Sequence, residues 1–374
     1  MSKVVISGSG VFTPKEVISN QELVKAFNEY ADLQNKKFAK EIASGEREPI
    51  PYSSEEFIVK ASGIENRHVM NKSGIIDPEI MYPIFNKRSD DELSLMAEMG
   101  VKAAKIALEK AGKDAKDIDC VIVAASNFER AYPAIAVEVQ KALGVKGFAF
   151  DMNIACSSAT FGLQMAADMI KSGSAKTVLM VNPEICSGHV EWRDRDCHFI
   201  FGDVGTAMVI EDSETADSSN QFEIIATKCV TEFSNNIRNN LGFLRRSYPN
   251  GMEDLRDMQF MQNGRKVFKD VVPMVSNLIL EHLNDNNIKV SNLSRLWLHQ
   301  ANKSMNDMIG RKVLGRVPNE KEQPNILQEY ANTSSAGSIV TFSQYSDDLE
   351  AGEIGIICSF GAGYSVGNVI LKKL

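Results

Sequence analysis

The stretch FDMNIACSSATFGLQMAADMIKSG (residues 150–173) joins an extended apolar run to a helical pattern, with one cysteine between them. After Cys156, apolar residues such as Leu163 and Ile170 recur at helical spacing, and Gly173 is a typical helix stop. A strand that passes through a tight turn into a helix is a common unit of α/β proteins. The pattern therefore predicts an α/β fold with a thiol at the N-terminus of a helix.

The same alternation extends over the rest of the chain. Strands are predicted at residues 3–8, 120–125, 177–182, 207–211, 224–229, 295–298 and 355–359. Helices are predicted at residues 93–111, 135–143, 157–170, 267–284 and 303–313. Strands that alternate with helices in this way are typical of an α/β sandwich.

Two kinds of polar segment interrupt this alternation. The acidic, serine-rich turn at residues 211–221 is the predicted boundary between an N-terminal half, residues 1–216, and a C-terminal half, residues 217–374. Charges and prolines break the pattern at residues 30–51 and 71–91, which we expect to be loops or short helical lids.

Composition narrows the class of protein. The chain has 374 residues, of which 44% are hydrophobic and 24% are charged, so it can form two packed halves. A net charge of −8 argues against a protein that binds nucleic acid, because such binding rests on phosphate neutralisation. The sequence contains neither a basic leader followed by a long apolar run nor an apolar run long enough to span a bilayer. We therefore expect a soluble, cytoplasmic protein with no membrane contact.

Metal and nucleotide cofactors are not expected. The six cysteines are scattered singly, which favours reduced thiols over a disulfide framework. A zinc site remains an alternative at CSGHVEWRDRDCHF (residues 186–199), but the donors lack the tight knuckles of structural zinc sites, so a loop is favoured. The glycine pairs in SGSG (residues 7–10) and GAGYSVG (residues 361–367) lack the third glycine of a dinucleotide-binding turn.

The position of Cys156 predicts a nucleophile. The free amides and the positive dipole end of a helix N-terminus stabilise a thiolate, so we expect the pKa of Cys156 to lie below the roughly 8.5 of a free thiol. Two other motifs carry polar residues at strand or helix ends. His299 follows an apolar strand in LWLHQANKSM (residues 296–305), and Asn332 precedes a small-residue turn in EYANTSSAGSI (residues 329–339).

Together these motifs resemble the β-ketoacyl-acyl carrier protein synthase III family of the thiolase superfamily. GIENRH (residues 63–68) and FGD (residues 201–203) add to the resemblance, which runs nearly end to end outside the two insertions. The resemblance implies a thiolase-like, five-layered αβαβα sandwich built from two similar halves. The N-terminal half would carry Cys156, and the C-terminal half would carry His299 and Asn332.

The resemblance also implies a two-step reaction without a cofactor. A Cys156 thiolate would attack an acyl-CoA thioester, giving an acyl-enzyme and free coenzyme A. Malonyl-acyl carrier protein would then lose carbon dioxide, and its enolate would attack the acyl group in a Claisen condensation that initiates fatty acid synthesis. His299 and Asn332 would donate hydrogen bonds to the enolate oxygen, and the backbone N–H groups of Cys156 and Ala362 would form the oxyanion hole.

Residues that differ between subfamilies favour the priming type. Asn332 stands where elongating ketoacyl synthases have a second histidine. Ser126 and Asn127 stand where hydroxymethylglutaryl-CoA synthases have a glutamate, and Glu129 lies further along. A condensing or acyl-transfer enzyme of secondary metabolism, and a catalytically idle acyl-binding relative, remain alternatives.

The coenzyme A site departs from the family pattern. Phe57 replaces the tryptophan that stacks on adenine and Ala61 replaces a phosphate-binding arginine, whereas Arg195 matches the stacking arginine. Asn302 of the HQAN motif is also assigned to this site. With a reduced adenine clamp, affinity shifts toward the acyl chain, because each buried methylene contributes about 0.8 kcal/mol. We therefore expect a starter longer than acetyl.

The resemblance assigns two protein partners. Tyr132 in ERAYPAI (residues 129–135) lies at the family's dimer contact, where an aromatic residue crosses the acyl pocket of the partner subunit. A homodimer is therefore expected, with Glu129 or Arg130 as polar partner of the phenol. Lys269, Arg311 and Lys312 are expected to dock the acidic acyl carrier protein.

Overall fold

The computed structural model describes residues 3–249 and 255–374. Within these residues, one hydrogen-bonded network of nine strands has the order β11-β12-β13-β8-β1-β7-β6-β4-β5. Its strands are β1 (Val4–Phe12), β4 (Cys120–Ala124), β5 (Phe148–Met152), β6 (Thr177–Ile185), β7 (Asp203–Asp212), β8 (Phe222–Ser234), β11 (Leu293–Leu298), β12 (Ile354–Gly361) and β13 (Gly363–Lys373). Two small ribbons pair β2 (Glu16–Ser19) with β3 (Asn66–Val69) and β9 (Ile237–Arg238) with β10 (Met261–Gln262).

The large sheet consists of two runs with the same topology. In the first run, β1 pairs antiparallel with β7, β7 antiparallel with β6, and β6 parallel with β4. In the second run, β8 pairs antiparallel with β13, β13 antiparallel with β12, and β12 parallel with β11. The runs meet where β1 and β8 pair through Val5↔Glu223 and Ile6↔Phe222 alone. The predicted boundary at residues 216/217, which stays a prediction, falls in the connection between β7 and β8.

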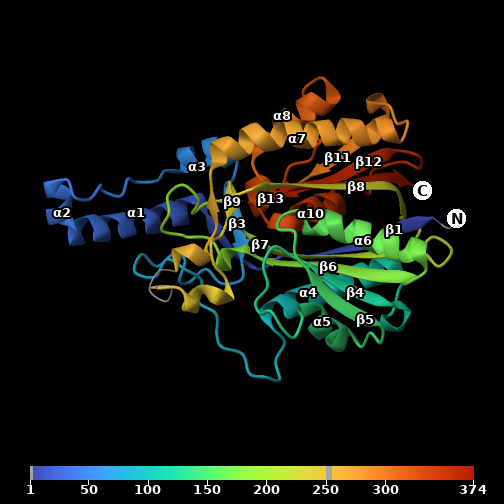
Figure 1. Ribbon diagram of the computed structural model, residues 1–374, viewed down its shortest axis with the longest axis horizontal. Coiled ribbons are helices and arrows are strands. Elements are labelled where there is room, and N and C mark those ends of the chain that lie inside the picture. The colour runs from blue at the N-terminus through green and yellow to red at the C-terminus, as the bar shows by residue number, and fades with distance from the viewer. Residues whose placement is uncertain (1–2, 250–254) are drawn as a thin grey trace.

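Helices cover both runs and separate them. They are α1 (Asn20–Lys37), α2 (Ala39–Ser44), α3 (Glu55–Ser62), α4 (Leu95–Ala111), α5 (Ile135–Leu143), α6 (Ser158–Ser172), α7 (Gly264–Asp285), α8 (Lys303–Leu314), α9 (Leu327–Tyr330) and α10 (Gly337–Gln344). Buried side chains of α6 and α10 form one apolar cluster with strands of both runs. α4 and α5 pack on the outer face of the first run, and α7 and α8 on that of the second (Figure 1). These layers confirm the predicted α/β sandwich.

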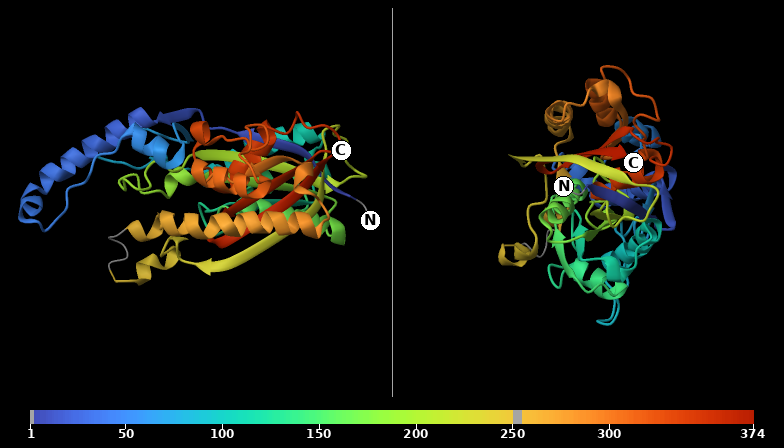
Figure 2. Two further views of the ribbon diagram at one scale, coloured as in Figure 1. Left: turned by 90° about the horizontal axis from the view of Figure 1, so that it is seen from above. Right: turned by 90° about the vertical axis from the view of Figure 1, so that its right-hand side faces the viewer.

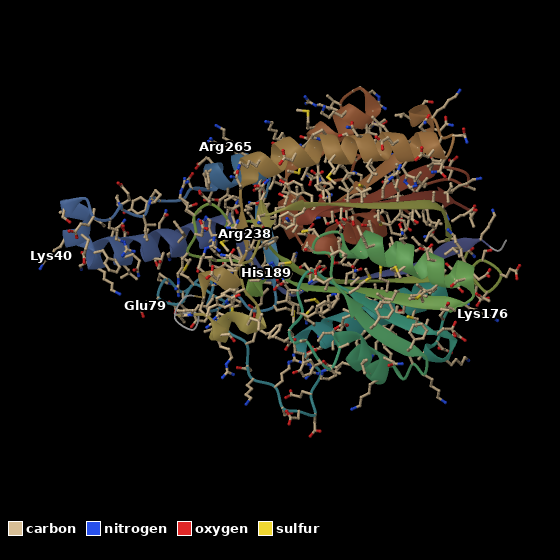
Figure 3. All side chains as sticks on the ribbon, in the orientation of Figure 1. Lys40, Glu79, Lys176, His189, Arg238 and Arg265 are labelled. Carbon is tan, nitrogen blue, oxygen red and sulfur yellow. The ribbon has the colours of Figure 1, made fainter. Side chains whose placement is uncertain are left out.

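The first polar insertion agrees with the prediction only in part. Residues 30–44 are mostly helical, because α1 continues through to Lys37 and α2 follows it, whereas residues 45–51 form a loop. Ser19 and Glu22 form a capping box at the start of α1, which fixes the helix start. The two helices extend beyond the body of the molecule as an arm, with Lys40 exposed near its tip (Figures 2 and 3). Residues 71–91 form turns and loops, as expected.

None of the helices in residues 3–249 and 255–374 combines the length and apolar composition needed to cross a bilayer.

Candidate active site

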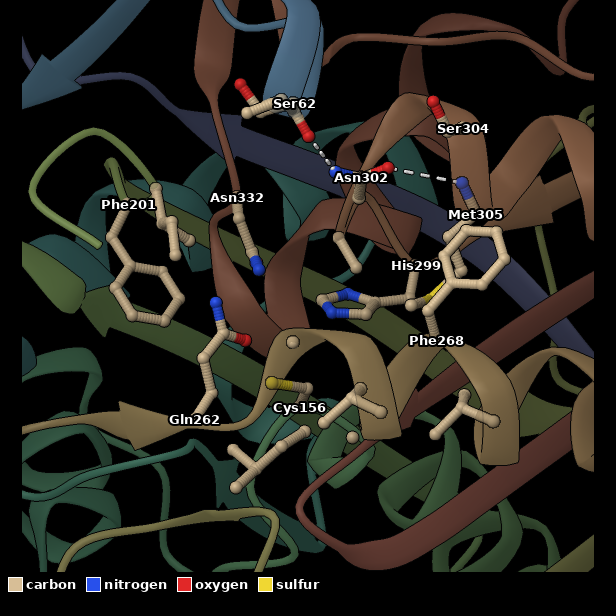
Figure 4. A pocket seen from close by; sticks show the side chains of 18 of the residues that line it. Ser62, Cys156, Phe201, Gln262, Phe268, His299, Asn302, Ser304, Met305 and Asn332 are labelled. Atoms are coloured by element: carbon tan, nitrogen blue, oxygen red, sulfur yellow. Dashed lines mark hydrogen bonds between the residues drawn. The ribbon is translucent and has the colours of Figure 1, made fainter. Parts of the chain in front are cut away.

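A cavity of about 660 Å³ opens between the two runs of the sheet and receives residues from both halves. Cys156, His299 and Asn332, which are far apart in the sequence, all line it. Their side chains point toward one another in Figure 4. Much of the remaining wall is aromatic: Phe57, Phe199, Phe201, Phe260, Phe268 and Phe360. The structure therefore brings the three predicted catalytic residues together in a largely apolar site.

Cys156 lies on the short connection between β5 and α6, one residue before the N-cap Ser157. Ala155 has a φ of 46°, a left-handed conformation that is strained for a residue with a Cβ. Two hydrogen bonds hold this turn: Asn153 Oδ1 accepts from the Ala155 N–H at 2.8 Å, and Ser158 Oγ accepts from the Ile154 N–H at 2.9 Å. The turn presents the thiol to the cavity.

The turn between β12 and β13 approaches the cysteine closely. A Cβ on Gly361 would lie 2.7 Å from the Cys156 Cβ, so only glycine fits there. The backbone N–H groups of Cys156 and Ala362 lie close enough to the sulfur to lower the pKa of the thiol. The Ser365 hydroxyl fixes this turn, because its oxygen lies at hydrogen-bond distance from both the Ala362 carbonyl (2.8 Å) and Ser157 Oγ (2.9 Å). Both predicted oxyanion-hole donors thus lie beside the thiol.

The predicted low pKa of Cys156 is wrong. Burial raises the pKa of the thiol to about 11, although the Ser334 hydroxyl donates to the sulfur at 3.3 Å and opposes the shift. The negative charge of Glu184 raises this pKa further. The desolvation cost of a thiolate in this apolar site outweighs the backbone N–H donors near the helix start.

His299 directly follows β11, is 2% exposed and makes a T-shaped contact with the ring of Phe360, with centroids 5.2 Å apart. Its backbone N–H donates to the Cys358 carbonyl at 2.8 Å, which fixes the residue at the end of the sheet. Burial lowers the pKa of His299 to about 4, against a smaller opposing effect of a backbone hydrogen bond with Ser334. The imidazole is therefore neutral at physiological pH, as predicted.

Asn332 is held by its backbone and by its own side chain. Its N–H donates to the Ile200 carbonyl at 3.0 Å, and its carbonyl accepts from the Gly202 N–H at 3.1 Å. Asn332 Oδ1 accepts from the Ser334 N–H at 2.9 Å. The NH₂ end of the amide is therefore directed into the cavity, next to the His299 ring (Figure 4).

Comparisons with known proteins agree with this geometry. A profile of the family described as 3-oxoacyl-[acyl-carrier-protein] synthase III matches residues 150–232, and the profile of its C-terminal part matches residues 283–373. A β-ketodecanoyl-[acyl-carrier-protein] synthase of Pseudomonas aeruginosa is 56% identical over 350 residues, covering 94% of this chain and 100% of the relative. The chain belongs to the β-ketoacyl-acyl carrier protein synthase III family. It is therefore a condensing acyltransferase.

More distant relatives match over the full length. A β-ketoacyl-[acyl-carrier-protein] synthase III of Clostridium perfringens is 30% identical, with all of both chains covered. The crystal structure of a 3-oxoacyl-[acyl-carrier-protein] synthase III from Aquifex aeolicus has a TM-score of 0.76 at 25% identity, again with all of both chains covered. The family fold thus accounts for the whole chain, apart from the local departures below.

The residues predicted to bind coenzyme A make contacts within the protein. The Arg195 guanidinium lies 3.9 Å from the centre of the Phe57 ring, and its Nε donates to the Tyr52 carbonyl at 2.7 Å. At contact distance, no base fits between them. The Asn302 side chain accepts from the Met305 N–H at 3.2 Å as the N-cap of α8 and donates to the Ala61 carbonyl. Phe57 and Asn302 both line the cavity. The guanidinium beside Phe57 and the side-chain amide of Asn302 already hydrogen-bond within the protein.

The residues assigned to protein partners lie on the surface. Lys269 on α7 and Arg311 and Lys312 on α8 are exposed on adjacent helices of one outer layer. Tyr132 is 84% exposed and is not among the residues that line the cavity described above. Neither expected partner contacts it within the subunit, because Glu129 accepts from the Met96 N–H and Arg130 pairs with Glu138.

The possible zinc donors are separated by other contacts. His198 Nε2 lies 3.1 Å from Ser53 Oγ, and His189 Nδ1 lies 3.0 Å from the Asn127 amide. In the described part of the chain, no three metal-binding side chains are grouped at these or other positions.

Several residues of the site were missed at the level of sequence. Gln262 on β10 directs its amide toward Cys156 and Asn332 (Figure 4), and no pattern around it indicates this. Ser334, with a φ of 51°, lies two residues after Asn332 in the motif at residues 329–339. Its place in that motif could have indicated that it lies near the thiol. Glu184 lies two residues beyond the predicted end of its strand, whereas β6 extends to Ile185.

Proposed function

We propose that this synthase III condenses an octanoyl starter with malonyl-acyl carrier protein, giving β-ketodecanoyl-acyl carrier protein. The convergence of Cys156, His299 and Asn332 in one apolar cavity carries the proposal. The chain length follows from the 56%-identical relative, because its ten-carbon β-ketodecanoyl product would contain two carbons of malonate and eight of the starter. The reduced nucleotide clamp at Phe57 and Ala61 agrees with a starter held largely by its acyl chain.

Acylation of Cys156 is the first step. The sulfur attacks the carbonyl carbon of octanoyl-CoA, and the carbonyl oxygen accepts hydrogen bonds from the backbone N–H groups of Cys156 and Ala362. The C–S bond to coenzyme A breaks as the new thioester forms. The thiol proton leaves with coenzyme A, so the step is balanced and uses no resident cofactor.

Decarboxylation and condensation follow. The thioester oxygen of the malonyl group accepts hydrogen bonds from the neutral His299 ring and the Asn332 amide, which stabilise the enolate as carbon dioxide leaves. The enolate carbon then attacks the octanoyl carbonyl on Cys156. Collapse of the tetrahedral intermediate releases the sulfur and the β-ketoacyl product.

The same proposal includes a homodimer in the cytoplasm. Tyr132 is 84% exposed and β5 is an open edge of the large sheet, so both are available to a second subunit. In that dimer, Tyr132 would complete the acyl pocket of the partner subunit. Lys269, Arg311 and Lys312 would receive the acyl carrier protein, whose acidic helix complements three exposed cations.

The mass of the intact protein after incubation with acyl-CoAs of increasing length tests the proposal. We expect octanoyl-CoA to add one octanoyl group to wild type and none to Cys156→Ser, because an alcohol is far less ionised than a thiol. With malonyl-acyl carrier protein, octanoyl-CoA should then give the fastest condensation.

Three results would contradict this function. Highest activity with acetyl-CoA, falling with length, would refute the starter assignment. No acylation by any acyl-CoA would indicate an idle acyl-binding relative. Acylation followed by condensation with a second acyl-CoA, but not with malonyl-acyl carrier protein, would indicate an enzyme of secondary metabolism.

A further inference from the structure

Glu184 is a buried carboxylate to which the reaction above assigns no role. It lies near the end of β6 with 1% of its surface exposed. Burial raises its pKa, while hydrogen bonds from Ser126 and Ser335 lower it. A buried carboxylate with several donors is costly to place in a core, so its contacts decide what it contributes.

One arm of these contacts reaches the cysteine. Glu184 accepts from the Ser126 N–H at 2.9 Å and from the Ser126 hydroxyl at 2.6 Å. The Ser126 carbonyl in turn accepts from Asn153 Nδ2 at 2.9 Å, and Asn153 Oδ1 accepts from the N–H of Ala155, the strained residue before Cys156. Glu184 is thus linked to the turn that presents the nucleophile.

A second set of contacts links Glu184 to the turn that carries the Asn332 amide. The Ser335 N–H donates to Glu184 Oε1 at 3.2 Å, and the Ser335 hydroxyl donates to the same oxygen. Ser335 follows Ser334, whose N–H holds Asn332 Oδ1 at 2.9 Å and whose hydroxyl contacts the Cys156 sulfur at 3.3 Å. The same carboxylate therefore holds the turn that carries Asn332.

We propose that Glu184 is a positioning residue that fixes the nucleophile turn of the N-terminal half relative to the Asn332 turn of the C-terminal half. The inference rests on the proposed function, because condensation is the step in which groups of both turns act on one substrate. An error of about 1 Å between such groups can cost on the order of 100-fold in rate. Acylation needs only the nucleophile turn and the adjacent Ala362.

Single substitutions separate the two arms. Ser335→Ala removes one donor from the Asn332 turn and should lower condensation about tenfold, with Cys156 acylation unchanged. Ser126→Ala removes the corresponding hydroxyl from the nucleophile side and should slow acylation as well. Glu184→Met keeps a similar length but removes every acceptor, so condensation should fall about 100-fold. Glu184→Gln retains an oxygen for the Oε1 contacts and should restore most of the activity.

Glu211 provides a matched control for the loss of a buried carboxylate. It is also fully buried, and it accepts from Ser7 Oγ at 2.5 Å and from Thr215 Oγ1 at 3.1 Å. It pairs with Thr177 at the opposite end of the ladder of β6 and β7, far from Cys156 along the strands. Glu211→Met should destabilise the protein without changing the rates per folded molecule.

The experiment measures octanoylation, condensation and thermal unfolding for all five variants, with rates normalised to folded protein. The proposal is supported by a condensation defect in Glu184→Met that Glu184→Gln rescues and Glu211→Met lacks. The proposal is overturned if Ser335→Ala condenses at the wild-type rate. This test remains decisive even if Glu184→Met fails to fold. Failure of wild type to acylate at all would refute the proposed function instead.

Discussion

The centre and the mouth of the cavity differ in how their residues are held. At the centre, Cys156 and Asn332 lie on turns fixed by several backbone and side-chain hydrogen bonds, and His299 lies at the end of a buried strand. At the mouth, Phe57 and Arg195 contact each other, and Arg195 Nε donates to the Tyr52 carbonyl. The reacting groups are thus positioned by the core of the fold, whereas the predicted nucleotide site rests on contacts between partly buried side chains.

Removing a donor at the centre should have the largest effect. His299→Ala and Asn332→Ala should each lower decarboxylation by about 100-fold or more, because each removes a preorganised donor to the enolate oxygen. Octanoylation of Cys156, measured by intact mass, should be affected much less. A failure of acylation with carbon dioxide still released from malonyl-acyl carrier protein would contradict this assignment. That result would mean that His299 and Asn332 serve acylation, and that the backbone N–H groups of Cys156 and Ala362 serve decarboxylation.

The reactivity of the thiol should show the effect of burial at the centre. The thiolate is the reactive form and the pKa of Cys156 is raised to about 11, so the reactive fraction increases with pH throughout the neutral range. Alkylation by iodoacetamide should accelerate about tenfold per pH unit between pH 7 and pH 9, with Cys156→Ser as the blank. A plateau below pH 8 would mean that the backbone N–H donors outweigh desolvation.

Charge reversal on the outer surface of α8 should weaken the binding of malonyl-acyl carrier protein alone. Arg311→Glu with Lys312→Glu should raise the KM for malonyl-acyl carrier protein about tenfold at low salt and less at high salt, because exposed charges are screened. Transfer from octanoyl-CoA to Cys156 should not change. Lys105→Glu with Lys110→Glu, on α4 in the opposite outer layer, is the matched control. Equal effects of both pairs would point to net charge and not to a docking surface.

At the mouth itself the expected effect is smallest. Arg195→Ala removes the guanidinium that is predicted to contact the nucleotide and should raise the KM for octanoyl-CoA about threefold, without a change in kcat. The same variant should use octanoyl-pantetheine as wild type does, because that substrate lacks the nucleotide. An equal loss with both substrates would show that Arg195 supports the local fold and not the nucleotide.

The same contrast shows what the sequence could predict. Helical and strand periodicity located α4, α5, α6, α7 and α8 to within a few residues, and motif order identified Cys156, His299 and Asn332. The pKa of Cys156 was predicted in the wrong direction because desolvation depends on aromatic side chains contributed by distant segments. The length of α1 was not predicted, because the charges in residues 30–51 are equally typical of loops and short helices. Glu184 was missed because its partners lie 58 and 151 residues away in the chain.

The narrow seam between β1 and β8 bears on how the enzyme could be divided. Cys156 precedes the connection between β7 and β8, and His299 and Asn332 follow it, so under the proposed mechanism neither fragment alone could catalyse condensation. Because the connection between β7 and β8 is an exposed polar turn, a cut within it leaves every strand of both runs intact. Two separately expressed fragments would each be inactive and would regain condensation activity only on reassembly. The chain is therefore a candidate for a fragment-complementation reporter, in which the separate fragments give almost no background activity.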